Sequence, residues 1–302
     1  MSVAIDPGTA VEAAEQFSLF GPFIEFGFMR RALVGCLALS LGATPIGAFL
    51  MLRRMSLAGD AMSHAVLPGA ALAYLFFGLS LSAMTAGGLV AGLAVALLAG
   101  GVARHSVLKE DASLAAFYLI SLSAGVLIVS LRGSSVDLLH VLFGSVLALD
   151  DDALFLLAGF CTVTLLALAA GFRLLVIDCC EPGFLRGVSR WSPIAHYGFL
   201  VLVVLNLVGG FHALGTLMAV GIMILPAAAA RFWVDSIGRL LLIAVGCAIS
   251  GSFIGLLLSY HLELPAGPSI VMTLGGFYLI SLAAGPHGPL RTRFARPWHY
   301  ET

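Results

Sequence analysis

Long apolar runs, interrupted by short polar segments, fill the sequence between residues 32 and 285. A transmembrane helix needs about 20 predominantly apolar residues, and nine runs approach or reach that length. We therefore predict nine spans, at residues 32–52, 55–77, 81–103, 113–131, 153–172, 193–210, 213–233, 237–260 and 267–285.

One further apolar run, at residues 136–149, is too short to cross a bilayer as a helix. Its length fits a half-helix or a re-entrant element. If this run did cross, the direction of every later span would be inverted.

The composition supports a membrane protein. Of the 302 residues, 60% are hydrophobic and only 10% are charged, and the mean hydropathy is +1.07. A soluble domain carries about 25% charged residues. We expect an all-α, polytopic membrane protein with about 8–10 transmembrane helices. Residues 28–286 would form the transmembrane domain, residues 1–27 an N-terminal tail or interfacial helix, and residues 287–302 a cytoplasmic basic tail.

The basic residues favour one orientation. With the N-terminus outside, the cytoplasmic segments hold twelve of the 15 lysines and arginines, and only Arg30, Arg31 and Arg132 face outward. Lysine and arginine are enriched on the cytoplasmic side of membrane proteins. We therefore predict an external N-terminus and a cytoplasmic C-terminus.

Two ionisable residues lie deep in the second predicted span, "SLAGDAMSHAVLPGAALAYL". Measured from Arg54 at the cytoplasmic edge, Asp60 lies about 9 Å and His64 about 15 Å into the span. Residues four apart share one face of a helix. Ionisable groups at this depth are costly unless they are paired or hydrated, and they commonly mark a functional site.

The Asp60–His64 pair has two interpretations. The two side chains could neutralise each other and fix helix packing, or they could bind a cation. A carboxylate and an imidazole suit Zn²⁺, Mn²⁺ or Fe²⁺. Two ligands are too few for a tight structural zinc site, so a cation site would be transient, or completed by water or by a second chain.

Two prolines follow similar patterns in distant spans. Pro68 lies in "VLPGAALAY", and Pro226 lies in "ILPAAAARF", 158 residues further along the chain. A proline removes a helical hydrogen bond, and we expect both to interrupt their helices. The second span would run outward and the seventh inward, as an inverted repeat of five plus five spans would produce.

Common catalytic motifs are absent from the sequence. No GxxxxGK[ST] pattern occurs, and no HExxH or GxSxG pattern occurs. The chain is therefore expected to be neither an enzyme nor an ATPase, and no nucleic-acid partner is expected. Active transport would draw on an ion gradient or on a separate ATPase chain.

Several motifs, in order along the chain, resemble the integral-membrane permease subunit of manganese/zinc/iron-type metal-ion ABC importers, the ABC-3 family. They are "RRMSLAGDAMSHAVLPGAALAYL" (53–75), "VDLLHVLFGSVLAL" (136–149), "CEPGFLRGVS" (180–189), "HALGTLMAVGIMILPAAAARFW" (212–233) and "SYHLELPAGPSIVM" (259–272).

This resemblance implies a bacterial inner-membrane permease that imports a divalent transition metal, with no permanently bound cofactor. Asp60 and His64 would contact the metal. The implied partners are an ATP-binding subunit in the cytoplasm, an extracytoplasmic metal-binding receptor and a second permease copy. The segment implied to couple with the ATPase contains Glu181, Pro182, Gly183, Phe184, Leu185, Arg186 and Gly187.

Further ligands and the identity of the metal stay open. Asp137, His140 and His212 are additional candidate ligands near the outer face, or ordinary interfacial polar groups. Histidines at the outer ends of the spans favour zinc slightly over manganese and iron. The alternative function is a gradient-driven cation transporter that works alone and uses Asp60 and His64 as a proton relay.

Overall fold

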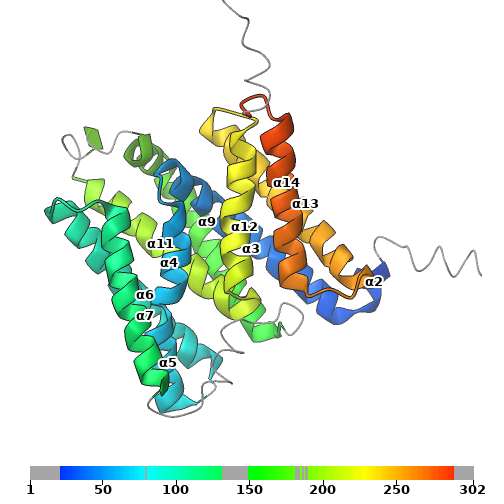
Figure 1. The fold of residues 1–302 in the computed structure, drawn as a ribbon, viewed down its shortest axis with the longest axis horizontal. Coiled ribbons are helices and arrows are strands. Elements are labelled where there is room, and N and C mark those ends of the chain that lie inside the picture. The colour runs from blue at the N-terminus through cyan, green and yellow to red at the C-terminus, as the bar shows by residue number, and fades with distance from the viewer. Residues whose placement is uncertain are drawn as a thin grey trace, which may run out of the picture.

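The computed structural model describes residues 21–78, 80–130, 149–180, 184–185, 187 and 190–288. This part of the chain is a bundle of α-helices (Figure 1). The helices are α2 (Gly21–Glu25), α3 (Gly27–Leu52), α4 (Ser56–Ala65), α5 (Leu67–Phe77), α6 (Leu81–His105), α7 (Glu110–Ser130), α9 (Asp151–Cys180), α11 (Ser192–Leu214), α12 (Thr216–Arg231), α13 (Ile237–His261) and α14 (Ala266–Ala284).

The predicted spans correspond to these helices. Within the described part of the chain, seven helices are long and apolar enough to cross a membrane. The two remaining predicted spans take other forms, because the second is divided into α4 and α5 and the seventh is the short apolar helix α12. The expected all-α membrane fold is therefore confirmed.

Two ion pairs show that α3 and α9 run in the same direction. Near the N-terminal ends of these helices, Arg31 Nη1 lies 3.5 Å from Asp151 Oδ1. At their C-terminal ends, Arg53 forms an ion pair with Asp178. We call the end of the bundle that holds Arg53 the Arg53 end. Glu110, the first residue of α7, lines the same cavity as Arg53, so α7 begins at the Arg53 end.

The interior is formed around α3, α11 and α12. In Figure 1, α3 and α12 lie at the centre, with α5, α6 and α7 on one side and α13 and α14 on the other. Gly47 of α3 lets the two central helices approach closely, since a Cβ atom there would lie 1.8 Å from the carbonyl oxygen of Met223 in α12. Such small-residue contacts are typical of packed membrane helices.

Pro226 does not interrupt its helix, which corrects the prediction made from the sequence. α12 continues through this proline, although the carbonyl of Ile222 loses the N–H donor that it would have four residues later. The hydroxyl of Thr44 in α3 donates to that carbonyl at 3.0 Å. A neighbouring helix thus supplies the missing hydrogen bond, as membrane proteins commonly do at prolines.

Pro68 lies beside a true interruption. α4 ends at Ala65 and α5 begins at Leu67, so Pro68 occupies the first turn of the new helix, where a missing N–H costs little. The hydroxyl of Ser121 in α7 donates to the carbonyl of Ala65 at 2.9 Å. The second span is therefore two half-helices stabilised from outside at their junction.

Some expectations are not tested by this structure. The external N-terminus, the inverted repeat and the division into a domain with two tails stay predictions. Residues 1–20, most of the short run 136–149 and residues 289–302 lie outside the described residues.

Candidate metal site

Asp60 and His64 lie on one side of α4. His64 Nε2 is 4.0 Å from Asp60 Oδ1, and the side chains are 43% and 68% exposed, respectively. The hydroxyl of Ser63 donates to the backbone carbonyl of Asp60 at 2.7 Å. The side-chain carboxylate of Asp60 takes no part in this hydrogen bond. The pair therefore presents an imidazole nitrogen and a carboxylate to the surroundings of α4.

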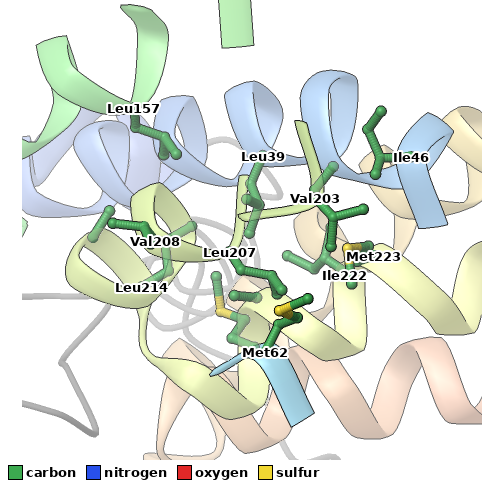
Figure 2. Close-up of a cluster of buried hydrophobic side chains, with 14 of the residues drawn as sticks. Leu39, Ile46, Met62, Leu157, Val203, Leu207, Val208, Leu214, Ile222 and Met223 are labelled. Atoms are coloured by element: carbon green, nitrogen blue, oxygen red, sulfur yellow. The ribbon is translucent and has the colours of Figure 1, made fainter. Parts of the chain in front are cut away.

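The opposite side of α4 is buried. Met62 is 1% exposed and points into the hydrophobic cluster beside Leu207, Ile222 and Met223 (Figure 2). Gly59 lies against the same region, because a Cβ atom there would lie 2.5 Å from the terminal methyl group of Met223. This packing fixes the rotation of α4 and directs Asp60 and His64 outward.

Both ends of α4 are defined by local backbone features. Before the helix, Arg54 adopts a left-handed conformation with φ of 61°, and the N–H of Met55 donates to the carbonyl of Leu50 at 2.9 Å. His64 lies in the last turn. A helix C-terminus carries partial negative charge, and the ends of interrupted helices bind cations in transporters. The termination of α4 thus strengthens the attraction of its last turn for a cation.

Within the described part of the chain, no group of three or more His, Cys, Asp or Glu residues could hold a metal ion. Asp60 and His64 therefore offer two side-chain ligands to a cation. Of the other candidate ligands, Asp137 and His140 lie outside the described residues. His212 lies on α11, but its side chain is not described.

The segment after α9 is described in part. Phe184 is 57% exposed, whereas Leu185 is 3% exposed and packs into the protein. Gly187 is exposed, and Glu181, Pro182, Gly183 and Arg186 lie outside the described residues. The segment is thus attached to the bundle at Leu185 and displays an aromatic side chain beside it.

A polar cluster at the Arg53 end was not predicted from the sequence. Arg53 bonds to Asp178, and His196 Nε2 lies 3.4 Å from Glu110 Oε1. These four side chains line a cavity of about 260 Å³. Asp178 is 6% exposed and His196 is 4% exposed, so both are more buried than Asp60. The predicted fifth span ended at residue 172, whereas α9 continues to Cys180 and carries Asp178 into the interior.

The sequence profile of the ABC 3 transport family matches residues 25–285, which include every helix from α3 to α14. The chain belongs to the ABC 3 transport family. The match includes α4 with Asp60 and His64, and it also includes the polar cluster at the Arg53 end. As a member of this family with seven candidate spans among its described residues, the chain is a multi-pass protein of the bacterial plasma membrane.

Similar curated proteins belong to metal transport systems. The chain is 33% identical to the manganese import system permease protein ScaB of Streptococcus parasanguinis, over 87% of this chain and 92% of the relative. It is 28% identical to the chelated iron transport system membrane protein YfeD of Yersinia pestis, over 93% of each chain.

Two solved structures share the fold. A chain in the structure of PsaBC from Streptococcus pneumoniae in complex with Fab superimposes with a TM-score of 0.78 at 30% identity, covering 91% of this chain and 98% of that one. A putative metal-chelate type ABC transporter in an inward-facing conformation gives a TM-score of 0.66 at 14% identity, with 93% and 91% covered. The second likeness supports the fold alone.

Proposed function

We propose that this chain is the permease subunit of an ATP-driven importer of a divalent transition metal, and that Asp60 and His64 contact the metal during passage. The observation that carries the proposal is the exposed Asp60–His64 pair on a half-helix of an ABC 3 family member. Relatives named for manganese and iron transport support a metal as the cargo.

A second copy of the chain would complete the site. An ionised carboxylate that faced lipid would cost several kcal/mol, yet Asp60 is 68% exposed on the surface of one chain. Leu57, one turn earlier, is 74% exposed on the same helix. Two copies facing each other across a two-fold axis would contribute two carboxylates and two imidazoles, enough ligands for a tetrahedral site.

The remaining subunits would meet opposite ends of the bundle. We assign the Arg53 end to the cytoplasm, because positive charge is concentrated in the segments there. The ATP-binding subunit would contact the segment around Phe184, whose exposed ring lies beside the anchored Leu185. The metal-binding receptor would deliver the ion at the other end.

Passage would require the pair to bind and release the ion in turn. Asp60 and His64 would replace part of the hydration shell, and the last turn of α4 would add its partial negative charge. A transport pathway also requires that the ion leave the site, so the two copies would have to separate their ligands once the ion has entered. ATP binding and hydrolysis on the ATP-binding subunit would open the pair alternately to the outside and to the cytoplasm.

The identity of the transported metal is a separate part of the proposal. The relatives' names favour manganese or iron, whereas the preference for zinc came from histidines near the outer ends of the spans. One carboxylate and one imidazole from each chain can bind all three metals. Measuring the metals that copurify with the partner receptor would decide, because the receptor sets what is delivered.

Reconstitution tests the proposed function directly. Proteoliposomes with this chain, its ATP-binding subunit and the receptor should take up Mn²⁺ only when ATP is supplied to the ATP-binding subunit. Proteoliposomes with this chain alone should not accumulate Mn²⁺ under a pH gradient. Uptake by the chain alone, driven by that gradient, would overturn the proposal in favour of a stand-alone transporter with Asp60 and His64 as a proton relay.

A further inference from the structure

A buried ion pair joins two helices at the Arg53 end. The side chains of Arg53 and Asp178 are 8% and 5% exposed. Arg53 Nη2 donates to Asp178 Oδ2, and the guanidinium carbon lies 4.1 Å from the centroid of the Phe199 ring. One arginine therefore connects the end of α3 with the last turn of α9 and the first turns of α11.

One side of this pair leads directly to the candidate metal site. Arg53 follows the last residue of α3, and α4 begins at Ser56. The backbone between them is held by the bond from the N–H of Met55 to the carbonyl of Leu50. A short, well-bonded turn of this kind transmits a displacement of Arg53 to α4, and thus to Asp60.

The other side of the pair leads toward the segment after α9 whose described residues are Phe184, Leu185 and Gly187, which we call the Phe184 segment. Asp178 lies in the last turn of α9, which ends at Cys180. The thiol of Cys179 lies 3.9 Å from the carbonyl oxygen of Phe49 in α3, within the range of a weak S–H hydrogen bond. The end of α9 is therefore attached to the end of α3 by an ion pair and by a neighbouring thiol contact.

We propose that Arg53 and Asp178 are positioning residues that transmit movement of the Phe184 segment to α4 and so change the opening of the Asp60–His64 site. The inference rests on the proposed function, in which the Phe184 segment contacts the ATP-binding subunit. Neither residue contacts the metal in this scheme. Their role is to make two segments, distant along the chain, move as one.

The physical argument depends on burial. Separating two charged side chains that are only 8% and 5% exposed would leave both poorly compensated. The pair therefore keeps the ends of α3 and α9 in register during a movement. The adjoining cavity, about 260 Å³ in volume, leaves room for the joined ends to shift within the bundle.

The same two helices offer a matched control at their other ends. Arg31 and Asp151 also join α3 to α9, but their side chains are 44% and 70% exposed. Exposed ion pairs of this kind contribute little to stability. Substitutions there remove a charge pair between the same helices without touching the connection to α4.

The experiment measures ions transported per ATP hydrolysed by the complete complex in proteoliposomes, with Mn²⁺ as the probe. Arg53→Gln and Asp178→Asn should each lower Mn²⁺ uptake about tenfold while ATP hydrolysis stays within about twofold of wild type. The exchange Arg53→Asp/Asp178→Arg should recover part of the lost ratio. Arg31→Gln and Asp151→Asn should leave the ratio unchanged.

A second variant keeps the inference testable if the single substitutions prevent folding. A buried ion pair can be replaced by apolar residues without loss of stability. The double variant Arg53→Met/Asp178→Leu should therefore assemble and hydrolyse ATP, but transport few ions per ATP hydrolysed. An unchanged ratio in assembled variants, or a parallel loss of uptake and hydrolysis, would overturn the inference. Absence of ATP-dependent uptake by the wild-type complex would instead overturn the proposed function.

Discussion

Asp60 and His64 differ from the Arg53–Asp178 pair in their surroundings. Arg53 and Asp178 are buried and paired, whereas Asp60 and His64 are exposed on a helix whose other side is buried. A group held open on a packed helix is suited to an exchangeable ligand, because binding requires no rearrangement of the core.

We expect Asp60→Asn and His64→Ala each to reduce ATP-dependent Mn²⁺ uptake by about a hundredfold, since the first removes the negative charge of the site and the second removes the imidazole nitrogen, in each of two copies. Insertion and folding of the single chain should be unaffected because both side chains are exposed on its surface. Leu242→Ala, at an exposed position of α13 away from the expected interface along α4, is the control and should retain uptake. Near-normal uptake by a well-inserted Asp60→Asn variant would contradict the assignment.

The pair could be predicted from the sequence because its signal is local, two ionisable residues four apart in an apolar run. The cluster at the Arg53 end could not, because Asp178 and its partner Arg53 are 125 residues apart. Hydropathy placed Asp178 outside a span, and only the fold shows that the arginine following α3 is buried with it.

At the scale of elements, carbonyl groups near Pro226 and Pro68 accept hydrogen bonds from hydroxyl groups of neighbouring helices. α12 is continuous through Pro226 because Thr44 of α3 bonds the carbonyl of Ile222. The expectation of an interruption was wrong there, since a proline shows which bond is lost but not which distant side chain replaces it. The interruption beside Pro68 follows from the local rule for proline in the first turn of a helix.

We expect Thr44→Val to lower the free energy of unfolding by about 1 kcal/mol, because the buried carbonyl of Ile222 loses a hydrogen-bond donor. Thr162→Val is the matched control, since Thr162 is exposed and its hydroxyl bonds a carbonyl of its own helix. Thermal unfolding of the two variants in detergent measures the difference. Equal midpoints would show that Thr44 does not support α12.

At the scale of the whole molecule, the spans could be predicted because a bilayer requires long apolar helices with internally bonded backbones. The direction in which α4 faces could not, because it depends on Met62 and Gly59 packing against α11 and α12. That packing leaves the candidate site at the surface of a single chain, which is the physical reason for proposing a dimer.

We expect Leu57→Cys, in a Cys180→Ser background, to form disulfide-linked dimers in membranes, because two copies should meet along α4. Leu242→Cys is the matched control, since Leu57 and Leu242 are 74% and 76% exposed but lie on different helices. Non-reducing electrophoresis after mild oxidation measures the products. Equal cross-linking at both positions would contradict an interface along α4.

The exposure of Asp60 on the surface of a single chain has a genetic consequence. If each pathway draws ligands from two identical chains, every substitution in α4 alters the site twice, and selectivity cannot change by one ligand at a time. In a cell that expresses wild-type and Asp60→Asn copies equally, random pairing leaves about one quarter of the dimers with two intact chains. If dimers with one defective chain are inactive, a defective allele would therefore be dominant. A mutation that changes the transported metal would likewise alter the ligands of both chains at once.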